Sequence, residues 1–285
     1  MWSTLRRAAL LGCLAGSLGG CAYLDLKQRQ LIFQPTEEIT GTPADFGFDF
    51  EELWLPVTQA TPEGVAEERL HAWWIASPLA DAPAVLYLHG NGWNIGDSAY
   101  ATARLRRIGF SVLAIDYRGF GKSSGPFPSE AQVYDDAQIG WDHLKSRQSD
   151  RRRRFVYGHS LGGAVAIDLA ARNPDMAGLI VESGFTSIRE LAGDVHGLGL
   201  LPLQWVVTQR FDSLSKIGAI KMPVLLLHGK ADVVIPFSMS ERLHAAAPQP
   251  KALVLVPDAG HSSIAVVAWE RYRQAMQDFV QRVGR

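Results

Sequence analysis

Residues 158–162 read Gly-His-Ser-Leu-Gly and predict a sharp turn from a strand into a helix. An apolar strand pattern, Phe-Val-Tyr, comes directly before them, and a run of small residues typical of a packed helix follows. A turn this sharp strains the backbone of Ser160 and lifts its hydroxyl clear of the sheet. Gly158 and Gly162 stand where a Cβ would collide as the chain reverses. Ser160 is therefore the candidate nucleophile.

A serine hydroxyl is a poor nucleophile at neutral pH, so it needs a base and a group that orients the base. Residues 223–229 read as a buried strand, and Asp232 follows in the loop beyond its carboxyl end. Residues 251–256 read as another strand, which His261 follows. In an open parallel sheet, functional groups gather outside the carboxyl ends of the strands. We therefore predict that His261 is the base and that Asp232 orients it.

Other acidic residues and histidines are weaker candidates than this pair. Glu182, which ends the predicted strand at residues 178–182, is an alternative acid, whereas Asp258 is better explained as a loop-capping carboxylate. None of the remaining histidines has the placement of His261. We expect packing, surface or local hydrogen-bonding roles for His71, His89, His143, His159, His196, His228 and His244.

Acyl transfer to a serine passes through a tetrahedral oxyanion, which two fixed amide donors would stabilise. One predicted donor is the backbone amide of Leu161, directly after the nucleophile. The other is expected in the loop after the strand at residues 84–88, where residues 89–92 read His-Gly-Asn-Gly. We assign it to Asn91. The alternative is an ordinary glycine-rich turn between a strand and a helix.

Four motifs occur in register along the chain. They are His-Gly-Asn-Gly at 89–92, Asp-Tyr-Arg-Gly-Phe-Gly-Lys-Ser-Ser-Gly at 116–125, Gly-His-Ser-Leu-Gly-Gly at 158–163 and His-Gly-Lys-Ala-Asp at 228–232. Together they resemble the serine hydrolases of the α/β-hydrolase fold, from about Glu68 to the C-terminus. The pattern is most similar to a membrane-associated subgroup that includes protein depalmitoylating thioesterases and bacterial lipoprotein hydrolases. The resemblance implies hydrolysis of esters or thioesters without a cofactor.

Strand and helix patterns alternate along most of the 285 residues, which suit one large α/β domain over residues 46–285. Two antiparallel strands are expected first, at 48–57 and 69–77. Further strands are expected at 84–88, 111–116, 154–157, 178–182, 224–227 and 252–256, and helices at 98–108, 129–145, 161–172, 238–246 and 264–283. This alternation predicts an α/β fold with a mainly parallel central sheet and helices on both faces.

Residues 185–219 interrupt the alternation and contain too many apolar residues for a simple solvated loop. We expect a small cap over the active site, with a peripheral helix packed on the domain as the alternative. If the segment is a cap, Leu203, Trp205 and Phe211 are candidates for lining an acyl pocket.

The N-terminus resembles a bacterial lipoprotein signal peptide over residues 1–20, with a short basic start and an apolar stretch before Cys21. Cys21 would become the lipidated first residue, and Cys13 is a competing site. An uncleaved anchor or an ordinary secretory signal are the alternatives. Residues 21–45 are expected to be a connector, with a short edge strand at 30–35. We therefore expect a lipoprotein attached to a membrane of the bacterial cell envelope, facing the periplasm or the exterior.

Composition narrows the function further. A formal net charge of −1 argues against nucleic acid as the principal partner. Loss of Cys13 with the signal and acylation of Cys21 would leave no disulfide and no thiolate metal site, and no His-Glu-x-x-His pattern occurs. We therefore expect a serine hydrolase acting on esters or thioesters of lipid-like or small acyl substrates, with no metal and no cofactor. The alternatives are a serine peptidase of the same fold and a catalytically silent lipoprotein that binds ligands.

Overall fold

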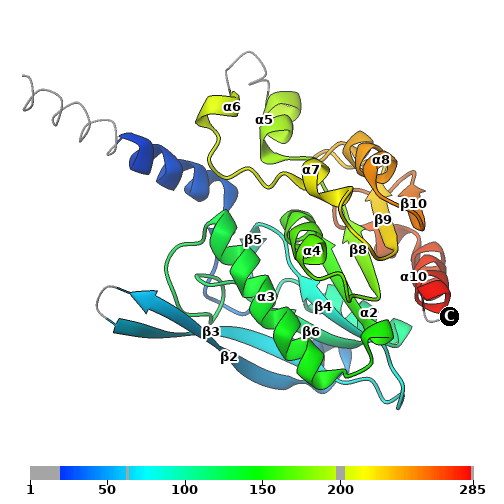
Figure 1. Ribbon diagram of the computed structural model, residues 1–285. Coiled ribbons are helices and arrows are strands. Elements are labelled where there is room, and N and C mark those ends of the chain that lie inside the picture. The colour runs from blue at the N-terminus through cyan, green and yellow to red at the C-terminus, as the bar shows by residue number, and fades with distance from the viewer. Residues whose placement is uncertain (1–19, 62–63, 197–202, 284–285) are drawn as a thin grey trace, which may run out of the picture.

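An eight-stranded sheet forms the centre of the computed structural model, which describes residues 20–61, 64–196 and 203–283 (Figure 1). Across the sheet the strand order is β10-β9-β8-β7-β4-β6-β3-β2. The strands are β2 Glu51–Thr61, β3 Gly64–Ile75, β4 Ala84–Leu88, β6 Ser111–Ile115, β7 Arg154–His159, β8 Gly178–Glu182, β9 Val224–Gly229 and β10 Lys251–Val256.

Six neighbouring strands, from β10 to β6, run parallel, and the antiparallel hairpin β2–β3 closes one edge of the sheet against β6. Strands β4, β8 and β9 are buried along their whole length. Their continuous apolar sequences follow from this position, because both faces of an inner parallel strand are covered. The predicted α/β class with a mainly parallel sheet is confirmed.

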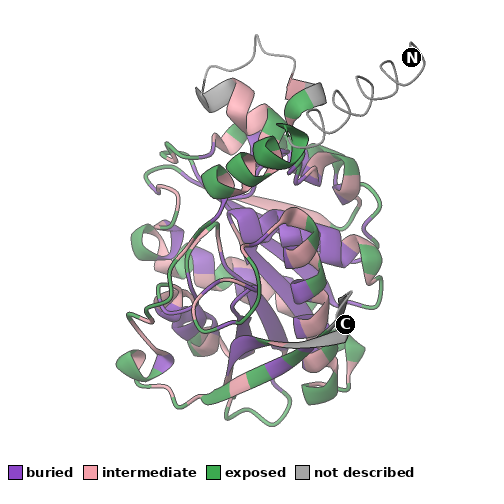
Figure 2. Cartoon of the chain, turned by 90° about the vertical axis from the view of Figure 1, so that its left-hand side faces the viewer, coloured by how far each residue is buried: buried purple, intermediate pink, exposed green. Residues whose placement is uncertain are grey.

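Helices cover both faces of the sheet, whose inner strands are buried (Figure 2). The buried side chains form two clusters, one on each face. One cluster takes side chains from α3 Glu130–Arg147, α4 Leu161–Arg172 and α8 Phe237–Ala246. The other takes side chains from α2 Ala99–Ile108 and α10 Trp269–Val283. Short 3-10 turns occur at Pro43–Phe46 and Arg151–Arg153.

The strand order reverses beside β4. Helix α2 leads from β4 to β6 on one side, whereas α3 leads back past β4 to β7 on the other side and covers the opposite face. The loops after β4 and β7 therefore part in opposite directions and leave a crevice at the carboxyl ends of the strands, where ligands bind in open α/β sheets.

Three short helices lie in the segment between β8 and β9: α5 Ile188–His196, α6 Leu203–Val206 and α7 Ser213–Ile217. Leu203 lines a hollow of about 380 Å³ together with Glu190 and Arg210. Ser160 does not line this hollow. Phe211 is fully buried against Phe33 and does not line the hollow at Ser160. The side chain of Trp205 lies outside the described residues. Neither Leu203 nor Phe211 therefore lines the hollow at Ser160, where an acyl pocket was expected.

The two ends of the chain differ from the expected pattern. Residues 20–32 are helical where a connector was expected, and only β1 Gln34–Pro35 remains of the short strand; it pairs in parallel with β5 Gly92–Trp93. Leu, Lys, Gln and Arg in this stretch have high helix propensity, which accounts for the helix. The helix expected at 264–283 is divided at Ala268 into α9 Ile264–Val267 and α10.

The predicted signal peptide lies outside the described residues except for Gly20. Cys21 is exposed on the N-terminal helix. No helix in the described part of the chain is long and apolar enough to cross a membrane.

Candidate active site

Ser160 lies in the turn between β7 and α4, with φ 55° and ψ −120°. This left-handed conformation is rare for a residue with a side chain, and it stores strain at the turn. A Cβ on Gly158 would collide with the backbone of Gly162, and a Cβ on Gly162 would collide with the carbonyl oxygen of Leu88. The two glycines thus allow β7, α4 and β4 to approach closely beneath the serine.

Ser160, His261 and Asp232 meet at the carboxyl edge of the sheet. The His261 Nε2 atom lies 3.0 Å from the Ser160 Oγ, and the His261 Nδ1 atom lies 2.8 Å from the Asp232 Oδ2. Their strands are far apart in sequence, but the parallel order brings the three loops to one edge. The structure therefore brings together the three residues that the sequence predicted as nucleophile, base and acid.

Asp232 is held as an anion by its surroundings. Its side chain is fully buried, which alone would raise its pKa. Hydrogen bonds from His228 Nε2 (3.1 Å) and His261 outweigh burial and hold the pKa of Asp232 well below its usual range. The other carboxylate oxygen accepts hydrogen bonds from the amides of Val234 and Ile235. The carboxylate therefore stays charged and fixed beside His261.

His159 and Ser183 hold the backbone of His261. The Ser183 hydroxyl donates to the His261 carbonyl at 2.7 Å, and the His159 Nε2 atom lies 3.2 Å from the same oxygen. Burial lowers the pKa of His159 to about 4, so its imidazole is neutral at neutral pH. A neutral ring that donates from Nε2 adds no second positive charge beside His261.

The loop after β4 lies directly against the nucleophile. A Cβ added to Gly90 would lie 3.5 Å from the Cβ of Ser160, which places the Gly90–Asn91 peptide next to the serine. His89 Nδ1 lies 2.9 Å from the Gly90 carbonyl oxygen. Leu161 is the first residue of α4, and the first amides of a helix have no acceptor within it. Asn91 and Leu161, the two predicted donors, thus flank Ser160.

A hollow of about 350 Å³ opens at these residues and is lined by Ser160, His261, Gly90 and Asn91. Trp93 and Tyr100 line the same hollow, so the reactive groups open onto a space that can receive a small molecule or the end of a longer one.

Glu182, the alternative acid, is engaged elsewhere. It forms a buried ion pair with Arg104 and accepts a hydrogen bond from Tyr157. Burial would raise the pKa of Glu182, but the Arg104 charge outweighs it and lowers that pKa. The backbone carbonyl of Glu182 accepts from the Ser160 amide at 2.9 Å, so Glu182 supports the turn rather than the imidazole. Arg104 could not be predicted as a partner of Glu182, because the residue pattern of α2 does not distinguish a buried arginine from a surface one.

Sequence comparison finds relatives along most of the chain. An Arabidopsis thaliana protein, "Alpha/beta hydrolase domain-containing protein WAV2", is 32% identical and covers 93% of this chain and 91% of its own length. An uncharacterized Mycobacterium tuberculosis protein is 34% identical over 86% of this chain and 84% of its own length. The "Lysophosphatidylserine lipase ABHD12" of Danio rerio is 34% identical over 81% of this chain and 64% of its own length.

Profile and structure comparisons agree with these relatives. A family profile described as "Serine aminopeptidase, S33" matches residues 81–215. A Pyrococcus furiosus esterase superposes with a TM-score of 0.69 at 22% identity, covering 87% of this chain and 98% of that one. A Pyrococcus horikoshii acylaminoacyl peptidase superposes with a TM-score of 0.62 at 16% identity, covering 83% and 42%. At these identities the two structures show a shared fold.

Proposed function

This chain belongs to the α/β-hydrolase family, and from that premise we propose that it is a serine hydrolase of carboxylic esters or thioesters with lipid-like or small acyl groups. The observation that carries the proposal is the continuous contact from Asp232 through His261 to the Ser160 hydroxyl, at 2.8 and 3.0 Å. A hydroxyl, an imidazole and a buried carboxylate at these distances form the arrangement that activates a serine.

In the proposed reaction His261 Nε2 takes the proton of Ser160 as the serine oxygen attacks the carbonyl carbon. The oxyanion that forms accepts hydrogen bonds from the amides of Asn91 and Leu161. When the tetrahedral intermediate collapses, the bond to the alcohol or thiol breaks and His261 gives its proton to that leaving group. Asp232 stabilises the imidazolium meanwhile. Water then attacks the acyl-serine by the same steps, releasing the acid and restoring Ser160.

A test compares three kinds of substrate. We expect hydrolysis of p-nitrophenyl esters of graded acyl length and of acyl thioesters, and little hydrolysis of aminoacyl p-nitroanilides. Ser160→Ala should lower kcat by about 10³-fold or more, because no other group can form the acyl intermediate. Ser146→Ala, an exposed serine on α3, is the matched control. Preference for the anilides would favour the peptidase, and no turnover of any substrate would favour the silent lipoprotein.

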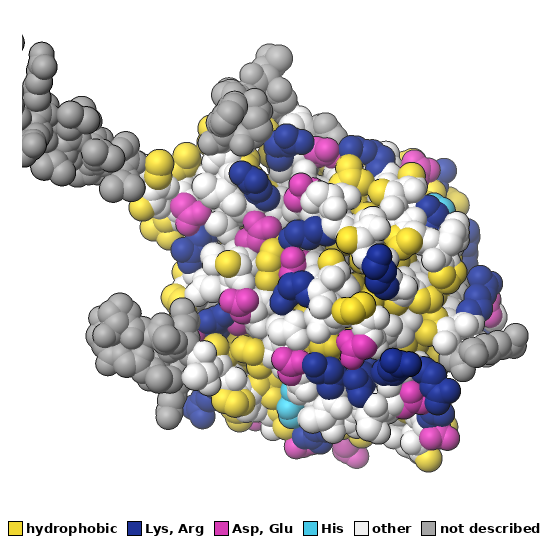
Figure 3. Space-filling model, viewed as in Figure 1, with side chains coloured by type: hydrophobic (Ala, Val, Ile, Leu, Met, Phe, Trp, Pro, Cys, Tyr) yellow, Lys and Arg dark blue, Asp and Glu magenta, His cyan; other side chains and the backbone are white. Residues whose placement is uncertain are grey.

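The distribution of exposed apolar side chains supports a lipid-like substrate. Twelve large apolar side chains are exposed in the described part of the chain, and all but Trp54 and Leu79 lie in the N-terminal helix or in segments after the carboxyl ends of the parallel strands. Leu79 follows the antiparallel strand β3, which ends at the opposite edge of the sheet. They are Tyr23, Leu24, Leu26, Leu31, Trp93, Val206, Val233, Val234, Val266 and Val267. Figure 3 shows hydrophobic side chains gathered on the N-terminal helix where it leaves the domain. Clustered exposed apolar residues are typical of surfaces that meet lipid or protein.

We further propose that Cys21 is the lipid-bearing first residue of a mature lipoprotein in a bacterial cell envelope. The position of Cys21 on an exposed helix that leads away from the domain leaves its thiol accessible to modification (Figure 1). The mass of the mature N-terminus tests this proposal. An acylated cysteine at residue 21 is expected, whereas cleavage at Cys13 or an unmodified N-terminus would contradict it.

A further inference from the structure

Residues 32–36, which we call the N-terminal strap, run beside the loop that carries Asn91. The Gln34 amide donates to the Asn91 carbonyl oxygen at 2.9 Å, and the Thr36 amide donates to the Trp93 carbonyl at 3.3 Å. This is the parallel pairing of β1 with β5. The strap therefore hydrogen-bonds to the backbone of the very loop that flanks Ser160.

The side chain of Asn91 makes a second contact with the strap. Its Nδ2 atom donates to the Ile32 carbonyl oxygen at 2.9 Å. On the preceding peptide, the Gly90 carbonyl faces His89 Nδ1 at 2.9 Å. Because the peptide group is planar and trans, the Gly90 carbonyl and the Asn91 N–H point in opposite directions, so the contact with His89 fixes the direction of that N–H. The two hydrogen bonds from the strap hold the other groups of Asn91, its own carbonyl and its side chain, and so fix the position of the residue about which that peptide could turn.

The strap itself is firmly attached to the domain. Phe33 is 1% exposed and makes edge-to-face contacts with Phe120 and Phe211. The Thr36 carbonyl accepts from the Gly121 amide at 2.8 Å. The strap is thus packed against the core of the domain through Phe33 and hydrogen-bonded to it through Thr36.

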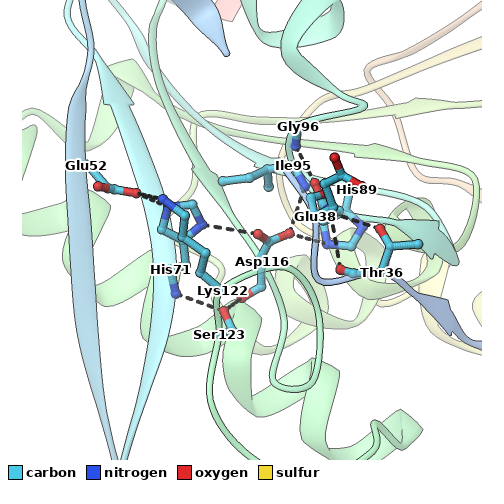
Figure 4. A network of polar contacts seen from close by, with 11 residues as sticks. Thr36, Glu38, Glu52, His71, His89, Ile95, Gly96, Asp116, Lys122 and Ser123 are labelled. Carbon is cyan, nitrogen blue, oxygen red and sulfur yellow. Dashed lines mark hydrogen bonds and ion pairs between the residues drawn. The ribbon is translucent and has the colours of Figure 1, made fainter. Parts of the chain in front are cut away.

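Asn94 adds a further tie on the far side of the loop. Its side-chain nitrogen donates to the Thr36 hydroxyl at 2.9 Å and to the Glu38 carbonyl at 2.7 Å (Figure 4). Its side-chain oxygen accepts from the Gly96 amide, and the neighbouring Ile95 amide donates to Asp116. Figure 4 shows this network extending from Thr36 and Glu38 to Asp116 and His89. Strap and loop are therefore held as one unit.

We infer that the strap is a positioning element of the oxyanion hole: its hydrogen bonds to Asn91 aim the Asn91 amide at the oxyanion. The inference rests on the proposed function. An oxyanion donor must lie within about 2.7–3.1 Å of the developing charge, so a small rotation of the Asn91 peptide would lose its contribution. The chain between Cys21 and the domain is consequently part of the active site, and displacement of the N-terminal helix would reach the reacting atoms through the strap.

Gln34 offers a matched pair of variants. Its side chain is exposed, so Gln34→Ala keeps the backbone donor, whereas Gln34→Pro removes it. Asn91→Ala is an independent second variant at an exposed side chain; it removes the bond to Ile32 and keeps the Asn91 amide. We expect Gln34→Pro and Asn91→Ala to lower kcat by about 10-fold or more, towards the 10²–10³-fold lost with one oxyanion donor. KM should change less than about twofold, and Gln34→Ala should match the wild type.

The rates are measured per active site, counted by titration with a fluorophosphonate, and compared with inhibition by a trifluoromethyl ketone, whose adduct with Ser160 carries an oxyanion. Lost positioning raises the inhibition constant in parallel with the fall in kcat/KM. Simple destabilisation lowers only the number of titrated sites. Unchanged kcat per site in both Gln34→Pro and Asn91→Ala would overturn the role of the strap. A wild-type protein that neither turns over esters nor reacts at Ser160 would instead overturn the proposed function.

Discussion

Two histidines share the carboxylate of Asp232. His261 Nδ1 and His228 Nε2 lie 2.8 and 3.1 Å from the same oxygen, and His228 Nδ1 lies 2.6 Å from the Ser240 hydroxyl. His228 touches the carboxylate but not Ser160, so it acts as a positioning residue that fixes the acid from behind. The acid is therefore held on one side by the base and on the other by a buried hydrogen-bond chain.

Asp232→Asn should lower kcat by about 10³–10⁴-fold, because the amide would not stabilise the imidazolium or hold the correct tautomer of His261. His228→Gln should cost less than about 10-fold, since the carboxylate keeps three other partners. Steady-state ester hydrolysis measures both. Asp258→Asn, at an exposed carboxylate, is the control and should match the wild type. Equal losses at Asp232 and Asp258 would contradict the assignment.

The low pKa of His159 makes a prediction for stability. Its folded value of about 4 lies below the usual 6.5, so between these pH values the unfolded chain binds one more proton at this residue. The free energy of unfolding should therefore fall as the pH falls from about 6.5 to 4, and this contribution is fully present above 6.5. In urea titrations at pH 7, 6 and 5, His159→Gln should show the shallower decline. Identical slopes would show that His159 does not titrate in this window.

The sequence could predict Ser160, Asp232 and His261 because each follows a strand whose apolar pattern is plain. The sequence could not show which carboxylate, Asp232 or Glu182, lies closer to His261, because Glu182 ends β8 and Asp232 follows the neighbouring strand β9. The deciding contacts, Arg104 with Glu182 and His228 with Asp232, join side chains whose directions depend on packing. Candidate catalytic residues at strand ends can therefore be predicted from a sequence, whereas the side chains that pair with a buried charge cannot.

The close approach of β7, α4 and β4 depends on glycine. Gly162→Ala would press a methyl group against the carbonyl oxygens of Leu88 and His89, which rigid backbone cannot move aside. We expect a loss of about 2 kcal/mol or more in unfolding free energy, or no folded protein. Gly218→Ala is the control, because its φ of −67° suits alanine and its nearest atom is 3.6 Å away. Chemical denaturation compares the two; equal stabilities would refute the steric argument.

Helix boundaries were predicted well where a strand pattern or turn residue marked them, as for α4. The N-terminal helix was missed because its sequence mixes polar residues with apolar ones that stay exposed and form no core-facing stripe. Its polar side chains hydrogen-bond to the end of α6 and to the segment that follows, as Gln28 does to the Val206 carbonyl and to the Thr208 amide. The break at Ala268 between α9 and α10 could not be predicted, because no glycine or proline lies there. The N-terminal helix depends on contacts with distant parts of the chain, which a local sequence pattern does not contain.

The proposed site residues lie at one edge of the molecule because the loops after the parallel strands meet there, where the strand order reverses beside β4. Loops after β4, β7, β9 and β10 supply Asn91, Ser160, Asp232 and His261 in turn. In the described part of the chain, all the exposed large apolar residues except Trp54 and Leu79 lie in the segments after the parallel strands or in the N-terminal helix. The strap and the N-terminal helix reach this edge as well, with Arg29 bound to the Pro128 carbonyl just before α3. The proposed substrate access, anchoring and reaction therefore share one side of the fold.

This arrangement predicts a difference between dissolved and lipid-borne substrates. The double variant Val266→Ser, Val267→Ser should turn over esters embedded in phospholipid vesicles several-fold more slowly, while hydrolysis of a short water-soluble ester changes little. Loss of apolar area at the rim weakens contact with lipid but leaves the reacting groups in place. Leu79→Ser, far from this edge, should leave both rates unchanged. Equal effects of the two variants on vesicles would contradict a lipid-facing rim.

The most direct measurement is the site of reaction with a fluorophosphonate, read by peptide mass mapping of the full chain. An activated serine should carry one adduct, on Ser160; Ser160→Ala should carry none, and His261→Ala should react far more slowly because the base is gone. Absence of an adduct on the wild-type chain, an adduct on a different serine, or an unchanged rate in His261→Ala would each contradict the account.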